Sequence, residues 1–219
     1  MAFRAALTAA VALGTGRAHP ETDASGVTQV ESLAWLPAVG LLVGVLAAAL
    51  ARIALGLGAP AADAAGATAL WVLGGDTRRS AIGIASGIAS AFALAGLTGP
   101  ERIAAFAVAP MLARWACVVQ CYGGTAAPGA RGLGALAGRA RFREFGWASV
   151  TALATTLSLL DAVGLVVTLV SALVTIAIRV ASYRRRRGID DGAMNATSAL
   201  VETSALVVLA AIAMWLRRG

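Results

Sequence analysis

The residues best suited to chemistry are a run of charged side chains in the last third of the chain. Four consecutive arginines, Arg184, Arg185, Arg186 and Arg187, are followed closely by Asp190 and Asp191. Guanidinium groups bind phosphate oxygens, and Mg²⁺ is usually held by one or two carboxylates together with substrate phosphates. The combination predicts a site for a phosphorylated substrate and Mg²⁺. Alternatively, the arginines only set membrane topology and bind anionic lipid.

Further charged residues are expected on the same side of the molecule. Asp76 and Arg78 lie in a short polar stretch between apolar segments, and Glu144 follows a second such stretch. We predict a magnesium ion on Asp76, Asp190 and Asp191. Arg78 and the four consecutive arginines would then neutralise the phosphates, an arrangement typical of phosphoryl transfer.

Two charged residues interrupt apolar segments. Arg114 lies within MLARWACVVQC, and Glu202 lies about two turns inside the last apolar segment. An unpaired carboxylate at that depth would be costly. Asn195, Ser198 and Glu202 recur at three and four residues, so they share one helix face, which we expect to point toward protein. We predict that Arg114 pairs with Glu202, in either a structural or a catalytic role.

The elements that position these residues are membrane helices. Hydrophobic residues make up 59% of the 219 residues, charged residues only 13%, and the mean hydropathy is +0.80. All 18 basic residues are arginine, and no basic stretch is interleaved with stacking aromatic residues, which argues against nucleic-acid binding. His19 is the only histidine, so a histidine-based metal site is excluded, and Cys117 and Cys121, without further ligands, make a poor metal site.

The apolar windows predict an all-α transmembrane bundle of about seven spans, forming a single domain over residues 1–219. Residues 1–32 are expected to form an interfacial helix and loop, although they also resemble a signal peptide, and residues 33–219 the bundle. The predicted spans are 33–55, 61–73, 81–97, 103–121, 147–160, 163–182 and 198–216. The fifth and sixth are separated around Asp161 and Gly164. Small residues predict close helix packing at Gly40, Gly44, Gly83, Ser86, Gly87 and Ser90.

Arginine placement predicts the orientation of these spans. With seven spans, the N-terminus and the loops after the second, fourth and sixth spans share one side, which holds twelve arginines. The other side holds only Arg102, Arg217 and Arg218. Because short cytoplasmic loops carry the arginine excess, we expect the N-terminus to be cytoplasmic.

Four segments resemble the cobalamin synthase family, also called adenosylcobinamide-GDP ribazoletransferase. The segment from Leu33 to Gly44 is similar to the family's first span, and Ala113–Ala116 is similar to its Ser-Arg-Trp-Ala helix. Gly132–Gly134 with Ala137–Arg139 resembles a family loop that ends in Gly-Leu-Gly. The closing stretch resembles the family's Gly-Asp-x-x-Gly-Ala segment and its glutamates through Gly188, Asp191, Ala196, Leu200 and Glu202.

The resemblance implies a multi-pass enzyme of the bacterial inner membrane. It would use Mg²⁺ to transfer adenosylcobinamide phosphate from its GDP derivative to alpha-ribazole or its 5'-phosphate, releasing GMP. Asp191 and Glu202 would be catalytic, Asp76, Asp190 and Asp191 would hold the metal, and Arg78, Arg114 and the four consecutive arginines would bind substrate. The implied partners are the two substrates, membrane lipid, a second copy of the chain or other membrane proteins of the pathway.

The chain departs from the family pattern at its principal carboxylate cluster. The family's His-Leu-Asp-Gly-Leu-Ala-Asp-x-x-Asp-Gly segment has no counterpart, because Trp71–Gly75 runs directly into Asp76–Arg78. This departure favours an alternative, a catalytically inactive paralogue that acts as a membrane scaffold for corrinoid enzymes. A transporter is a weaker alternative, because the charges gather at one face and not along a path near the midplane.

Overall fold

The computed structural model describes residues 26–54, 66, 68 and 81–218. These residues form helices, and the described part of the chain has no strand, only an isolated parallel bridge between Ala126 and Ile189. The predicted all-α fold is therefore confirmed. The predicted interfacial segment, the second predicted span, Asp76 and Arg78 lie largely or wholly outside the described residues.

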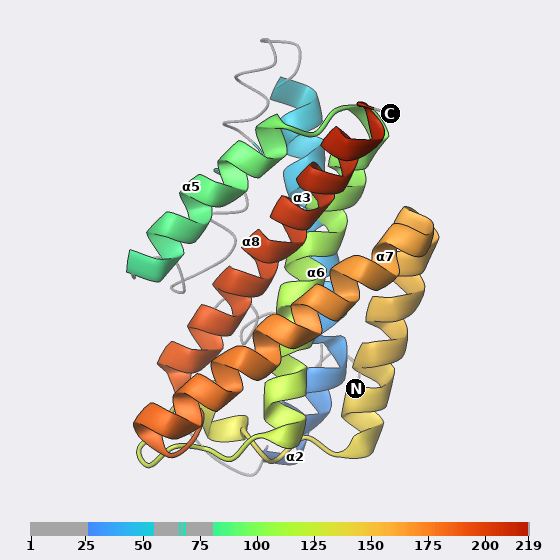
Figure 1. Ribbon diagram of the computed structural model, residues 1–219. Helices are drawn as coiled ribbons and strands as arrows, with labels where there is room; N and C mark the ends of the chain where they lie inside the picture. The colour runs from blue at the N-terminus through green and yellow to red at the C-terminus, as the bar shows by residue number, and fades with distance from the viewer. Residues whose placement is uncertain (1–25, 55–65, 67, 69–80, 219) are drawn as a thin grey trace.

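Figure 1 shows how the described helices are arranged. They are α2 (Gly26–Ser32), the 3-10 turn η1 (Leu33–Trp35), α3 (Leu36–Ala54), α5 (Ala81–Ala95), α6 (Gly99–Gly123), the 3-10 turn η4 (Gly134–Leu136), α7 (Phe142–Arg186) and α8 (Asp191–Leu216). Among the described residues, four helical stretches are long and apolar enough to cross a membrane: Gln29–Ala54, Glu101–Gly123, Phe142–Arg186 and Asp191–Leu216. A shorter apolar helix covers Ile82–Ala95. These helices indicate a membrane protein, and the count of seven spans is not confirmed.

The helix α7 is not one straight rod. Its 45 residues would measure about 68 Å, more than twice the thickness of a bilayer's hydrocarbon core. Asp161 breaks the helical conformation with φ 48° and ψ −135°, and the chain turns back there into a second arm (Figure 1). A Cβ on Gly164 would lie 2.8 Å from the carbonyl oxygen of Thr156, so glycine is required at this turn. The predicted break around Asp161 and Gly164 is confirmed.

The helix α6 occupies the centre of the bundle and contacts α3, α7 and α8. Its Pro110 has no N–H, so it removes the helical hydrogen bond to the carbonyl of Phe106. Gly44 of α3 packs against that carbonyl, and Gly40 packs against Pro110, so closely that a Cβ at either position would clash with backbone. The predicted close packing at these two glycines is confirmed.

On the other side, α5 packs against α8 through small polar residues. Ser86 Oγ donates to the carbonyl of Ala199 at 2.8 Å, and Ser90 Oγ lies 3.2 Å from Thr203 Oγ1. Both serines are buried, which confirms their predicted packing role. Each hydroxyl here finds a partner on the neighbouring helix, as expected where no water is available.

The outer surface of the bundle is apolar and carries tryptophans near both ends. Trp35 and Trp147, at the starts of α3 and α7, lie toward one end, and Trp215 lies at the last turn of α8. Tryptophan is enriched where helices leave the hydrocarbon core. The exposed apolar side chains between these levels are therefore the lipid-facing surface.

Candidate functional site

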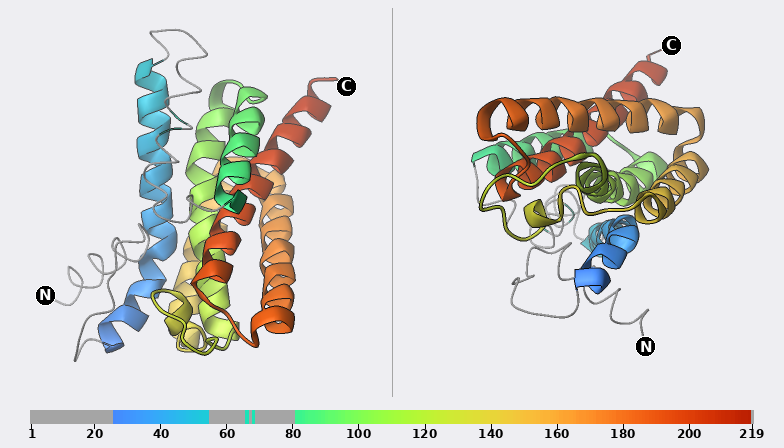
Figure 2. Two further views of the ribbon diagram at one scale, coloured as in Figure 1. Left: turned by 90° about the vertical axis from the view of Figure 1, so that its left-hand side faces the viewer. Right: turned by 90° about the horizontal axis from the view of Figure 1, so that it is seen from below.

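Two segments far apart in the sequence form one polar end of the bundle. The loop between α6 and α7 (residues 124–141) lies beside the α7–α8 connection (residues 187–190), and Figure 2 shows both at the same end. The Ile189 N–H donates to the Thr125 carbonyl at 2.8 Å, and the Ala127 N–H donates to the Ile189 carbonyl at 2.9 Å. Gly188 permits this approach, because a Cβ there would lie 2.7 Å from the Ala127 nitrogen.

Asp191, the first residue of α8, fastens the loop to this helix. Its Oδ2 accepts from the Arg131 N–H at 3.0 Å, and its Oδ1 accepts from the Gly134 N–H at 3.2 Å. A Cβ on Gly134 would lie 2.8 Å from the Asp191 nitrogen, so only glycine allows the loop to come this close. A carboxylate is also favoured at a helix N-terminus by the helix dipole. Asp191 therefore holds the loop in place.

Asp190 caps the same helix. One of its carboxylate oxygens accepts from the Ala193 N–H at 2.8 Å, and the other forms an ion pair with Arg186 Nη1. This is the usual role of aspartate at an N-cap, where it satisfies a backbone N–H that the helix cannot. Both adjacent aspartates thus have structural hydrogen bonds.

Eight exposed arginines surround these two segments, and together they are called the arginine surface below. They are Arg131, Arg139, Arg141, Arg143, Arg184, Arg185, Arg186 and Arg187. Arg184, Arg185 and Arg186 form the last turn of α7 and Arg187 is its C-cap. Their predicted role in substrate binding stays a prediction. The first four were predicted only as determinants of topology, and their part in one continuous surface depends on the contact between loop and α8.

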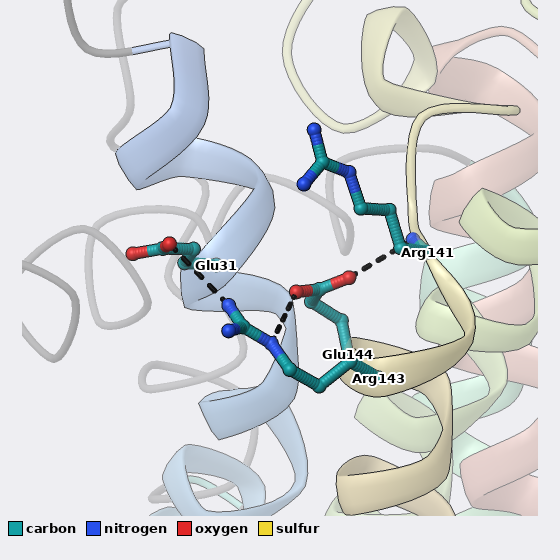
Figure 3. Close-up of polar contacts among 4 residues, drawn as sticks. All are labelled: Glu31, Arg141, Arg143 and Glu144. Carbon is teal, nitrogen blue, oxygen red and sulfur yellow. Dashed lines mark hydrogen bonds and ion pairs between the residues drawn. The ribbon is translucent and has the colours of Figure 1, made fainter.

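Glu144, expected among the acidic residues of the site, is instead a buried structural residue at the start of α7 (Figure 3). Its carboxylate accepts from the Arg141 N–H at 3.0 Å and from Arg143 Nε at 3.2 Å. The Nη2 of Arg143 lies 3.3 Å from a carboxylate oxygen of Glu31 on α2. This chain of contacts ties the beginning of α7 to α2.

Arg114 and Glu202 lie inside the bundle. Both side chains are 4% exposed, which confirms that each faces protein. Arg114 Nη1 donates to Ser198 Oγ at 2.6 Å, and Ser198 lies one turn before Glu202 on the same face of α8. Along the helix axis Glu202 lies about 16 Å from Asp191, so these two carboxylates cannot share one ion. This hydrogen bond brings Arg114 to the face of α8 that carries Glu202, and a direct Arg114–Glu202 pair stays a prediction.

A second polar group, which the sequence analysis did not identify, lies between Arg114 and the arginine surface. Gln120 Nε2 donates to the carbonyl of Thr175 at 3.2 Å and to Thr197 Oγ1 at 3.1 Å. Arg179 Nε donates to Gln120 Oε1 at 2.9 Å. One feature of the sequence could have identified this group. Arg179 lies within an apolar span, and arginines in such spans usually face the bundle interior.

The chain was compared with models of known protein families. A family model described as cobalamin-5-phosphate synthase matches residues 80–211, which is 132 of the 219 residues. The chain belongs to this family. No curated protein and no solved structure matches it significantly. The matched region runs from the start of α5 into α8, so it includes Arg114, the loop, Asp191 and Glu202.

Membership of the cobalamin-5-phosphate synthase family supports a role in cobalamin biosynthesis. Within 26–54, 66, 68 and 81–218, no group of three or more His, Cys, Asp or Glu residues is placed to hold a metal ion. Asp190 and Asp191 are used by backbone and arginine donors, and Asp76 lies outside the described residues. The described residues alone therefore do not form the predicted magnesium site.

Proposed function

We propose that this member of the cobalamin-5-phosphate synthase family transfers adenosylcobinamide phosphate from its GDP derivative to alpha-ribazole or its 5'-phosphate. The proposal rests on family membership and on the arginine surface, which lies at one end of an apolar bundle. An amphiphilic corrinoid nucleotide would place its diphosphate at such an end and its bulky body at the membrane surface.

The reaction is a substitution at phosphorus. With alpha-ribazole as acceptor, its 5'-hydroxyl oxygen forms a bond to the phosphorus that carries the adenosylcobinamide group. The bond from that phosphorus to the oxygen of the GMP phosphate breaks, and GMP leaves with the electron pair. The hydroxyl proton passes to water. The protein's task is then to hold the two substrates in line and to stabilise the charge on the transferring and leaving phosphates.

The arginine surface provides groups for this task. Arg184, Arg185 and Arg187 are exposed at the end of α7, next to the loop that Asp191 fastens. Guanidinium groups bind phosphate oxygens with two parallel N–H donors, and several of them around a diphosphate stabilise the developing charge. In this proposal Asp191 is a positioning residue, because it acts through the loop.

The other predicted site residues keep more limited roles in the proposal. Arg114 and Glu202 hold α6 and α8 in register below the surface. Arg78 and Asp76 would approach the phosphates from outside the described residues, and a requirement for Mg²⁺ would rest on Asp76. We also propose that the arginine surface faces the cytoplasm, where guanine nucleotides are found, in a bacterial inner membrane.

A second candidate function is an inactive paralogue that scaffolds corrinoid enzymes in the membrane. The observation in its favour is the direct run from Gly75 to Asp76, without the Asp-rich segment of the resembled family. The two candidates differ in turnover, so an activity measurement separates them.

The test is complementation of a bacterial strain that lacks cobalamin synthase, supplied with cobinamide and dimethylbenzimidazole. We expect growth, and we expect the triple variant Arg184→Gln, Arg185→Gln, Arg187→Gln to lose at least about tenfold in GMP release by purified protein, since each charge-assisted contact contributes about 1.5–3 kcal/mol. Arg52→Gln, an exposed arginine in the last turn of α3 at the opposite end, is the matched control.

Full activity of the triple variant would refute the assignment of the arginine surface. Full growth that survives alanine at Asp76, Asp191 and Glu202 together would refute the wider site assignment. An absence of growth from well-expressed, folded protein would favour the scaffold. Chelation of divalent cations during the purified assay tests the magnesium requirement independently.

A further inference from the structure

A cavity of about 290 Å³ lies at the end of the bundle opposite to the arginine surface. Its walls come from the start of α6, the turn of α7 and the last turns of α8. Nine of its eleven lining residues are apolar, including Leu97, Leu160 and Leu216, and the other two are Glu101 and Asp161. The volume is close to the lower limit for small-molecule sites, and the apolar walls suit a hydrocarbon group.

The two carboxylates come from separate elements, and both line this cavity. Glu101 lies in the first turn of α6, and Asp161 lies where α7 leaves the helical conformation. Both side chains are exposed, and neither forms an ion pair with a described residue. An apolar cavity with carboxylates at its edge is complementary to an amphiphile that has a cationic head.

Positive charge lies close to the same cavity. Arg217 and Arg218 directly follow Leu216, a lining residue, and Arg217 Nη2 donates to the carbonyl of Gly96 near the end of α5. Trp215, 75% exposed, marks the level of the membrane interface at this end. The cavity therefore lies at the depth of lipid headgroups, with acidic groups at its edge and basic groups beside it.

We propose that this cavity binds a phospholipid with a primary ammonium headgroup, such as phosphatidylethanolamine. The ammonium donates to Glu101 and Asp161, the phosphate lies toward Arg218, and the first part of an acyl chain packs between Leu160 and Leu209. A zwitterionic headgroup matches the two signs of charge, whereas an anionic headgroup would meet the carboxylates unfavourably. The site is separate from the arginine surface and does not depend on the proposed transfer reaction.

The test is a titration of purified full-length protein in detergent with short-chain phosphatidylethanolamine, phosphatidylcholine and phosphatidylglycerol, followed by the shift in Tm. We expect phosphatidylethanolamine to bind at least about tenfold more tightly than the other two, because only its ammonium offers N–H donors to both carboxylates. The double variant Glu101→Gln, Asp161→Asn should lose this preference. Asparagine tolerates the positive φ at position 161 better than most residues do.

The controls separate this proposal from a general lipid effect. Glu31→Gln, at the opposite end, should keep the preference for phosphatidylethanolamine. Ile212→Trp, which fills the cavity, should remove it without changing any charge. Equal binding of the three lipids by the unmodified protein, no measurable binding, or an unchanged preference in the double variant would each overturn the proposal. The lipid comparison on the unmodified protein decides the matter even if a variant fails to fold.

Discussion

Replacing Glu202 or Arg114 alone should destabilise the bundle far more than replacing both. Each side chain is 4% exposed, and Arg114 already donates to Ser198 Oγ, one turn from Glu202. Removing one partner of a buried pair leaves an uncompensated charge, which costs about 3–5 kcal/mol, whereas replacing both by apolar residues is often nearly neutral. We therefore expect Glu202→Leu and Arg114→Met each to cost about 3 kcal/mol or more.

A variant of Ser198 separates the contribution of the hydrogen bond from that of the two charges. Ser198→Ala removes a hydrogen bond to a charged donor, which contributes about 1.5–3 kcal/mol, and leaves both charges in place. The double variant Arg114→Met, Glu202→Leu should lose less than the two single variants together, by about 2–4 kcal/mol.

The assay is equilibrium unfolding of the purified protein in mixed micelles, with far-UV circular dichroism as the readout. If the loss in the double variant equals the sum of the two single losses within about 0.5 kcal/mol, the two residues are not coupled, and the predicted pair is refuted. Glu31→Gln serves as a control, because its ion pair with Arg143 is exposed and contributes at most about 1 kcal/mol.

Three further predictions concern packing, the loop and orientation. Gly44→Ala should cost about 2 kcal/mol or more in unfolding free energy because its Cβ meets α6 backbone, whereas Gly146→Ala, in open space, should stabilise α7 by up to about 1 kcal/mol. Asp191→Asn should speed hydrogen exchange at the Gly134 amide by about tenfold, since one carboxylate acceptor is lost. Unchanged exchange would contradict the role of Asp191 in holding the loop. An alkaline phosphatase fusion after Arg187 should be inactive and one at the C-terminus active, and an active Arg187 fusion would disprove the proposed orientation.

The sequence predicted the helices best where the membrane requires long apolar segments. Hydropathy identified the described spans, and Asp161 with Gly164 correctly marked the turn in α7. The last helix begins at Asp191, seven residues before the predicted span. Asp190 caps it there, and Thr197, just outside the predicted span, is buried and accepts a hydrogen bond from Gln120 of α6. A hydropathy window cannot register polar residues that are paired inside a bundle.

The candidate site was only partly predictable. Arginine clusters are visible in any sequence, but the contacts that position them use backbone N–H groups, such as those of Arg131 and Gly134, which have no sequence signature. Glu144 was expected near the substrate, and its position in a capping arrangement depends on the exact residue at which α7 begins. The packing of the folded chain decides which carboxylates accept hydrogen bonds from backbone N–H groups.

The contact between the loop and α8 also sets an order for biosynthesis. The ribosome makes the loop at residues 124–141 first, then the whole of α7, and only afterwards Ile189 and Asp191. Until α7 has inserted, turned at Asp161 and returned to the same side of the membrane, the loop lacks its hydrogen bonds to Ile189 and Asp191. The arginine surface is therefore completed late, after nearly all of the chain has been translated, and an incomplete chain released before α8 would lack it.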